Sequence, residues 1–516
     1  MKRRDFIQNT FAGVVMPALL NGLSFKAYGN VDEAAIGDDH VLVVVQLSGG
    51  NDGLNTVIPI DKYSLYQNAR ANIAIPKEKL LLIPQTDTLG LNPGMVNMQT
   101  MFKEGKAALI QSVGYPNPNF SHFRATDIWN SSSDSNVYVS NGWTGRYLAI
   151  DNPNFPMGYP NAKSPDPLAI QIGSVVNTAL QGPIQPMGMA ISNPSSFYNL
   201  ISNKVESTPN TLAGKELKYL REVAVQTNQY ATTIKNAASK VTKQATYPNT
   251  SLANQLKIVA QLIGGGLKTK VYYVSMGGFD THSNQTDATD KSIGAHATLW
   301  KTVTDAIKAF SDDITALGVS NRVMGLTYSE FGRRVKSNAS GGTDHGAAAP
   351  MFMFGDLVNS VVLGTTPDIA ASPTTNDNVT MQYDFRSVYA SILQNWFCLN
   401  SAYIDDVLLK DFQPLPLVQV QACGNITANE PILKEELITN SPNPFGDSTM
   451  LSFITKGGHT MVQIFDNVGR IVATPVDAEL DAGRHEVMLE TKDFNSGMYF
   501  ARLQNGSIQQ VRRMIK

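Results

Sequence analysis

The chain has 516 residues, of which 42% are hydrophobic and 16% charged, and its formal net charge is -2. The length exceeds that of one ordinary domain, because domains cluster at roughly 100–200 residues. The small net charge excludes a general attraction to nucleic acid or to an anionic membrane. With 40 glycines and 26 prolines, the composition favours a loop-rich secreted protein over a helical bundle.

Residues 1–29 have the pattern of a signal peptide. Arg3 and Arg4 begin a charged region, an apolar stretch covers residues 11–23, and residues 27–29 (Ala-Tyr-Gly) have the small-x-small pattern of a cleavage site. The adjacent arginines indicate the twin-arginine route, which exports folded proteins; the alternative is an amphipathic N-terminal helix. Because a membrane-spanning helix needs about 20 apolar residues, we expect no transmembrane anchor in the mature chain.

Residues 38–420 are predicted to form an α/β domain with a largely parallel sheet and flanking helices. Residues 41–47 are a nearly continuous run of apolar and β-branched side chains, which is typical of a strand buried on both faces. Further strands are expected at 107–113, 271–276, 323–327 and 351–354, and helices at 95–102, 295–317 and 388–397. Strands that alternate with helices indicate a parallel sheet. A polar helical insertion is expected at about 205–265.

The chain changes in character near its two cysteines, Cys398 and Cys423, which can pair in an oxidising compartment or both stay free. Residues 424–440 are expected to be a linker. Residues 441–516 contain short strand patterns about ten residues apart, which predict a small all-β sandwich. Within it, Asn505-Gly506 is a strong hairpin signal.

This tail resembles the C-terminal sorting domain of type IX secretion substrates. The matching segments are Ser-Pro-Asn-Pro-Phe at 441–445, Asp-Asn-Val-Gly-Arg at 466–470, Gly-Met-Tyr-Phe at 497–500 and the basic finish at 512–516. The resemblance implies the type IX secretion machinery as a partner and a path through the periplasm to the outer-membrane surface or the extracellular space. Anchored and released forms both stay open. The alternative is a carbohydrate-binding or adhesive sandwich.

Five polar clusters lie mostly where the expected strands end, which is where ligands bind in open α/β sheets. They occupy residues 47–56, 119–124, 277–282, 328–334 and 342–346. Three of the seven histidines, His122, His282 and His345, fall among them, close to Asp or Ser. Carboxylate with imidazole and no thiolate suits zinc, manganese or iron. Taken singly, each cluster is more typical of a turn, but together they predict a functional site.

The order of these clusters is similar to that of the bacterial family catalogued as domain of unknown function 1501. The matching segments are Leu-Ser-Gly-Gly-Asn-Asp-Gly-Leu-Asn at 47–55, Ser-His-Phe at 121–123, Gly-Gly-Phe-Asp-Thr-His at 277–282, Ser-Glu-Phe-Gly-Arg at 329–333 and Gly-Thr-Asp-His-Gly at 342–346. The family has no settled activity, and its motif order resembles that of the alkaline phosphatase superfamily. The resemblance therefore implies an alkaline-phosphatase-like α/β fold.

The resemblance also implies one or two divalent metal ions. Asp52 matches the metal-binding aspartate after the first strand. Asp280, His282 and His345 match the ligands of one metal, and Glu330 stands where a ligand of a second metal usually lies. Only Thr281 separates Asp280 from His282, although the superfamily commonly has three intervening residues, so the second metal site is expected to be degraded or absent.

Ser121 takes the nucleophile position by the same resemblance, supported by His122 or Arg124. Arg124 or Arg333 is expected to bind the oxyanion of the substrate. The alternative nucleophiles are Thr56 and Thr126.

Two functions remain open from the sequence. The first is an exported metal-dependent hydrolase of phosphate, sulfate or related esters, with a small-molecule or glycan ester as substrate and no nucleic-acid partner. A formylglycine sulfatase is not expected, because neither cysteine lies in the required C/S-x-P-x-R context. The second is a non-catalytic cell-surface binding or assembly protein on the same scaffold. The substrate, the metal and the oligomeric state are not evident from the sequence.

Overall fold

The structure is a computed structural model that describes residues 39–153, 155–194, 229–242, 244–423, 438–442, 445–466, 470–505 and 508–516. The predicted signal peptide lies outside the described residues. So do the first part of the predicted helical insertion, most of the predicted linker, and the turn at Asn505-Gly506 beyond Asn505.

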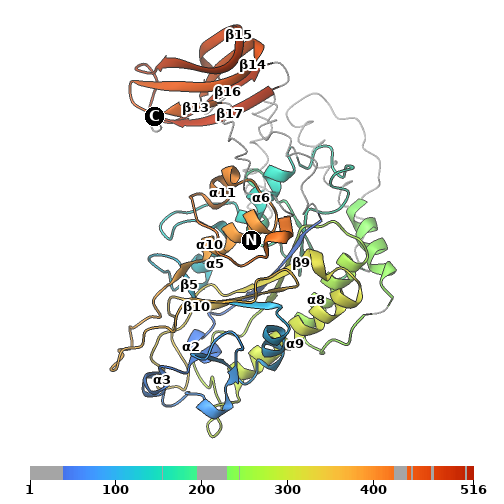
Figure 1. Cartoon of the computed structure of the whole chain (residues 1–516), viewed down its shortest axis with the longest axis vertical. Helices are drawn as coiled ribbons and strands as arrows, with labels where there is room; N and C mark the ends of the chain where they lie inside the picture. The colour runs from blue at the N-terminus through green and yellow to red at the C-terminus, as the bar shows by residue number, and fades with distance from the viewer. Residues whose placement is uncertain are drawn as a thin grey trace, which may run out of the picture.

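The described part of the main domain is built on a nine-stranded sheet in the order β11-β5-β10-β9-β1-β8-β6-β7, with β12 also paired to β5 (Figure 1). Its strands are β1 (Val41–Leu47), β5 (Ala107–Gly114), β6 (Ala169–Ile172), β7 (Met189–Ile191), β8 (Val271–Met276), β9 (Val323–Tyr328), β10 (Ala349–Gly355), β11 (Val362–Leu363) and β12 (Tyr383–Asp384). All five predicted strands are present, and the prediction of a largely parallel α/β fold is confirmed.

One strand in the middle of the sheet runs against the others. β10 pairs antiparallel with both β9 and β5, whereas β1 pairs parallel with β8 and β9. The chain therefore enters β10 at the same sheet edge where it leaves β1, β5, β8 and β9. This reversal brings the loop before β10 together with the loops that follow the other four strands.

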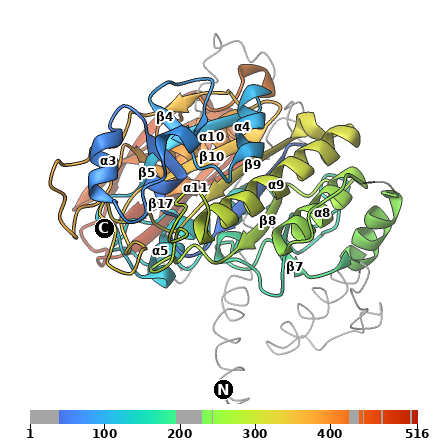
Figure 2. The same cartoon turned by 90° about the horizontal axis from the view of Figure 1, so that it is seen from below.

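Helices cover both faces of the sheet, because each face of β1 is apolar. Val41, Val43 and Val45 belong to one hydrophobic core, and Leu42 and Val44 belong to the other. The first core includes α4 (Val96–Lys103), α8 (Ser251–Gly264) and α9 (Ala295–Ala316), and the second includes α5 (His122–Ser131), α6 (Trp143–Asp151), α10 (Phe385–Asn395) and α11 (Ser401–Leu408). Figure 2 shows α8 and α9 side by side on their face.

The described part of the predicted helical insertion comprises helical residues 229–240 and α8. Both contribute to the first core through Ile234, Ala237, Leu256 and Val259, among others. Helix α8 therefore packs against one face of the main sheet. A short sheet of β2 (Val57–Pro59), β4 (Leu89–Leu91) and β3 (Leu81–Leu82), with α2 (Gly53–Thr56) and α3 (Tyr63–Ala69), lies nearby in the chain.

The C-terminal part is antiparallel β structure, as predicted, but its strands form one connected sheet. β13 (Ile438–Ser441), β14 (Ser448–Asp466), β16 (Met498–Asn505) and β17 (Ile508–Ile515) pair in that order, and β15 (Ile471–Glu490) pairs with β14. β14 is longer than the short strands expected from the sequence, and it contains Gly457 and Gly458, which both adopt positive φ, a conformation that glycine tolerates. The C-terminal part is thus a five-stranded antiparallel sheet in which β14 and β15 are long strands.

The two cysteines form a disulfide, with their Cα atoms 5.7 Å apart. It connects the segment after α10 to the short 3-10 helix Val420–Cys423 and closes a loop with a sequence separation of 25 residues. Among the described helices, none has the length and apolar character needed to cross a membrane.

Candidate metal centre

Four loops bring polar side chains to one edge of the main sheet. Asp280 follows β8, Glu330 follows β9, His345 precedes β10, and His122 begins α5 after β5. These segments are far apart in the sequence, and the reversed direction of β10 is what places His345 beside the other three. The position agrees with the general location of ligand sites in open α/β sheets.

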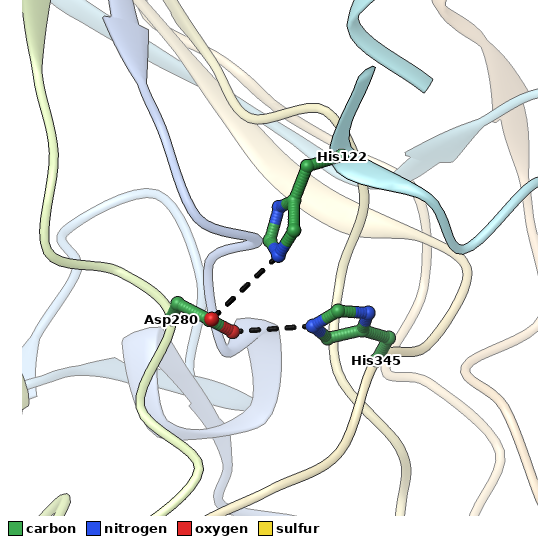
Figure 3. A group of neighbouring side chains, drawn as sticks. All are labelled: His122, Asp280 and His345. Carbon is green, nitrogen blue, oxygen red and sulfur yellow. Dashed lines mark hydrogen bonds and ion pairs between the residues drawn. The ribbon is translucent and has the colours of Figure 1, made fainter. Parts of the chain in front are cut away.

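Three side chains converge closely enough to hold one metal ion. One ligand atom each from His122, Asp280 and His345 lies within 4.8 Å of the other two. Figure 3 shows both imidazole rings turned toward the carboxylate, with His345 Nε2 3.1 Å from Asp280 Oδ1 and His122 Nε2 3.6 Å from Asp280 Oδ2. His282 joins them, because its Nε2 is 3.1 Å from Asp280 Oδ1 and 3.0 Å from His345 Nε2.

Each of the three histidines is held at its other nitrogen by an oxygen atom. His345 Nδ1 donates to the backbone carbonyl of Phe120 at 2.8 Å, His122 Nδ1 lies 2.8 Å from Glu330 Oε1, and His282 Nδ1 lies 3.1 Å from Asp344 Oδ1. A carbonyl or carboxylate oxygen requires the proton on Nδ1. In the neutral ring, Nε2 is then left as a lone pair that faces Asp280, which is the usual arrangement for a metal-binding histidine.

This arrangement leaves two lone pairs facing each other. With Nδ1 protonated in both rings, His282 Nε2 and His345 Nε2 have no hydrogen between them at 3.0 Å. Two acceptor nitrogens at that distance repel, unless a proton or a metal cation lies between or beside them. The residues therefore fit a divalent cation, and nitrogen ligands with one carboxylate suit zinc best, with manganese and iron as alternatives.

Arg333 holds the carboxylate of Asp280 in place. Its buried guanidinium donates to Asp280 Oδ1 at 2.6 Å, to Gly50 O at 2.7 Å and to Thr343 O at 2.8 Å, and also to Gly49 O. Partial burial raises the pKa of Asp280, but the hydrogen bond from Arg333 and the charge of Arg333 outweigh this and lower the pKa below its usual value. The carboxylate is therefore held in its charged form, with Oδ2 turned to His122.

Gly49 allows the loop after β1 to reach the site. Its φ is +126°, and a Cβ atom there would lie 2.4 Å from the backbone nitrogen of Asp280. Only glycine avoids this collision. The Gly49 N–H also donates to Glu330 Oε1 at 2.8 Å, so the glycine loop and His122 share one buried carboxylate.

A buried amide connects two of the loops that carry ligands. Gln285 Oε1 accepts hydrogen bonds from the hydroxyls of Thr281, at 2.9 Å, and Thr343, at 3.0 Å. Thr281 lies between Asp280 and His282, and Thr343 lies two residues before His345. Gln285 Nε2 in turn donates to Asp52 Oδ2 at 2.5 Å. All four side chains of this group (Gln285, Thr281, Thr343 and Asp52) are buried.

Asp52 is not a ligand in this arrangement, contrary to the prediction. It is fully buried, and Arg70 Nη1 lies 2.7 Å and 2.6 Å from its two oxygens. Burial raises the pKa of Asp52, but the charge of Arg70 and the hydrogen bonds from Arg70 and Gln285 lower it overall. A carboxylate already neutralised by an arginine supports the loops and does not need a metal.

Glu330 also lies behind the histidines. Its side chain is almost fully buried, and Oε1 accepts from Gly49 and His122. The structure thus places it as the partner that orients His122, whereas the sequence suggested a ligand of a second metal. The predicted residues that the structure brings together are His122, Asp280, His282, Glu330, Arg333 and His345.

The remaining predicted catalytic residues point elsewhere or lack a contact with the centre. Arg124 donates through Nη2 to the backbone carbonyls of Val137, at 2.6 Å, and Ser135, at 3.1 Å, so its charge is used within the α5 region. Ser121 is exposed at the N-cap of α5, with its backbone N–H bonded to Asn119 Oδ1. Its hydroxyl has no described hydrogen bond to the histidines or to Asp280.

Sequence reasoning missed four supporting residues: Phe120, Asp344, Gln285 and Arg70. Asp344 had a usable signal, because it directly precedes His345 in a polar loop. Phe120 contributes only its carbonyl, which no side-chain pattern reveals. Gln285 and Arg70 act through long-range contacts that no local motif marks.

Together, fold and centre define an α/β protein with an imidazole–carboxylate site and a separate β tail. Residues 205–408 match the family described as protein of unknown function (DUF1501), and residues 441–516 match the secretion system C-terminal sorting domain. Both resemblances stated from the sequence are confirmed. The sorting domain supports export to the cell surface or the extracellular space. A search of curated proteins found no match.

Solved structures with a similar course of the chain come from the alkaline phosphatase superfamily. A member from Vibrio parahaemolyticus is 8% identical, with a TM-score of 0.33, and the match covers 87% of this chain and 84% of that one. A sulfatase from Pseudoalteromonas sp. is 11% identical, with a TM-score of 0.32 and coverage of 93% and 87%. At scores this low, the neighbours carry no inference about the chemistry of this chain.

Proposed function

We propose that this protein is an exported metal-dependent hydrolase of phosphate, sulfate or related esters. One observation carries the proposal: three imidazole Nε2 atoms converge on the carboxylate of Asp280, while an oxygen atom holds each Nδ1. Such an arrangement costs free energy in an empty site, because like atoms face each other. A bound cation relieves that cost.

His122, Asp280 and His345 would hold the metal, with His282 as a further ligand. A divalent cation at this place supplies Lewis acidity, which polarises an ester oxygen and lowers the pKa of water. The chain's own residues orient these ligands: Glu330 fixes the ring of His122, Asp344 fixes that of His282, and Arg333 keeps Asp280 charged.

Two nucleophiles are compatible with the site, the hydroxyl of Ser121 and a water molecule. Ser121 precedes His122 directly at the N-cap of α5 and its side chain is exposed, so its hydroxyl is one candidate nucleophile. The alternative is water, with one of the imidazoles as the general base. Neither Arg124 nor Arg333 is free for the substrate, because both guanidinium groups donate to protein oxygens. The oxyanion would therefore depend on the metal and on the N-terminal end of α5.

The test is hydrolysis of 4-nitrophenyl phosphate and 4-nitrophenyl sulfate by the purified mature chain, metal-free and after addition of zinc, manganese or iron. We expect turnover that requires a metal and falls at least 100-fold in His122→Ala. Ser121→Ala separates the two nucleophiles, because activity survives in that variant if water attacks. Metal binding without turnover of any ester would contradict the hydrolase.

A non-catalytic surface binding protein is the second candidate. The observation that favours it is that the two predicted oxyanion-binding arginines are both engaged with protein oxygens. Such a protein would keep the metal as a structural or ligand-binding element, and the assay with metal-loaded protein would show no turnover.

A further inference from the structure

Helix α5 carries an exposed aromatic side chain at the residue that follows His122. Phe123 follows His122, and 87% of its side chain is exposed. A single exposed apolar residue is common on protein surfaces, so its meaning depends on what surrounds it.

A second exposed ring lies close by and is held in place. Tyr138 is 81% exposed, and the Arg124 guanidinium lies 4.0 Å from the centroid of its ring. The guanidinium is fixed in turn by the carbonyls of Val137, Ser135 and Asp134. Arg124 therefore covers one face of Tyr138 and leaves the rest of an ordered ring open to solvent.

A cavity lies between α5 and the segment that follows Tyr138. It has a volume of about 190 Å³, and the residues that line it are Asp127, Ser131, Val139, Ser140, Asn141 and Thr178. Asp127 lies one helical turn after Phe123, so the two side chains are neighbours on the surface of α5. Residues 139–141 follow Tyr138 directly. The polar groups of the lining are thus one carboxylate, one amide and three hydroxyls, beside the apolar side chain of Val139.

This combination recognises a particular chemistry. Aromatic rings contact the C–H faces of a saturated ring, and carboxylate, amide and hydroxyl groups bond its hydroxyls. The negative charge of Asp127 repels an anionic group, so the ester group belongs at the metal centre and not in this cavity. Asp127 is the fifth residue after His122 on the helix, which corresponds to about 7.5 Å along its axis.

We infer that the exposed face of α5 and the adjoining cavity form a subsite for a neutral sugar ring, which would place the ester of the same molecule at the metal centre. The inference rests on the proposed function for the role of the ester. Binding of the sugar itself needs only Phe123, Asp127, Tyr138 and the cavity.

The test is binding of the full mature chain, loaded with zinc, to an array of neutral, sulfated and phosphorylated glycans, followed by titration calorimetry with the best neutral glycan. We expect binding of a neutral glycan, and at least a ten-fold loss of affinity in both Phe123→Ala and Asp127→Ala. Leu82→Ala, which removes another exposed apolar side chain, is the matched control and keeps full affinity.

The His345→Ala variant separates this inference from the proposed function. If the subsite exists, the variant still binds the neutral glycan after losing its metal, whether or not the protein is a hydrolase. The inference is overturned if no neutral glycan binds, if only anionic glycans or proteins bind, or if Phe123→Ala and Asp127→Ala bind as tightly as the native chain.

Discussion

At the level of single residues, the candidate centre depends on which nitrogen of each imidazole faces the carboxylate. The sequence identified His122, Asp280, His282 and His345, because polar residues at strand ends tend to converge. It did not reveal that Asp52 is paired with Arg70. A carboxylate in a glycine-rich loop looks like a metal ligand, and only the fold shows that Arg70 reaches it from a different segment.

His296 predicts a pH-dependent stability. It is fully buried, and desolvation lowers its pKa to about 4, although the charge of Asp52 partly opposes this. The unfolded chain binds the proton near pH 6.5, so stability is present above that value and is lost as the pH falls toward 4. The loss is roughly 3 kcal/mol, from about 2.5 pKa units at 1.36 kcal/mol each.

Urea unfolding of metal-free native protein and of His296→Gln between pH 7 and pH 4 measures this loss. Other groups titrate in the same window and cancel in the difference between the two proteins. The native protein should lose more stability than the variant. Equal slopes would show that His296 is not the group responsible.

Thr281 predicts a change in metal affinity. Thr281→Val removes the hydroxyl that donates to Gln285 Oε1 and keeps the shape of the side chain. Because residues behind the ligands tune metal sites, we expect a 10–100-fold weaker affinity for zinc, measured by competition with a chelator. Thr304→Val, another buried threonine, is the control and should bind zinc normally. Unchanged affinity in Thr281→Val would exclude a positioning role for this contact.

At the level of secondary-structure elements, the direction of β10 decides where the centre forms. The sequence predicted the strand from its apolar run, yet a run buried on both faces gives no direction. If β10 were parallel to β9, the loop with His345 would enter at the opposite edge of the sheet. Strand identity could thus be predicted from the sequence, but the antiparallel pairing could not, because it depends on the loop between β9 and β10 staying at one end of the sheet.

The disulfide predicts a stability contribution at the same level. It joins the end of α10 to residues 420–423 and closes a loop of about 25 residues, for which chain entropy gives roughly 3 kcal/mol. In a protein in which Cys398 and Cys423 are both changed to serine, the free energy of unfolding should fall by roughly 3 kcal/mol. Urea unfolding measures this as a lower midpoint concentration. An unchanged midpoint would mean that the bridge constrains nothing in the unfolded chain.

At the level of the whole molecule, the main domain and the C-terminal domain differ in how much of their structure could be predicted from the sequence. The sorting domain was recognised from short segments, and its strands were expected to be short, whereas β14 and β15 are long and Gly457 and Gly458 lie within β14. In the main domain, the fold was predicted, and so were most of the polar residues that the structure brings together at the candidate centre. The buried supports Arg70, Gln285 and Glu330 depend on contacts between distant segments, and these arise only when the whole sheet is assembled.

The central claim is that this sheet edge holds a divalent cation, and metal content by mass spectrometry on the purified mature chain tests it most directly. We expect about one equivalent of a transition metal per chain, lost in His345→Ala. It should be retained in His459→Ala, which removes an exposed histidine of the C-terminal domain. No metal in the native protein after expression with zinc, manganese and iron supplied, or metal retained in His345→Ala, would contradict the claim.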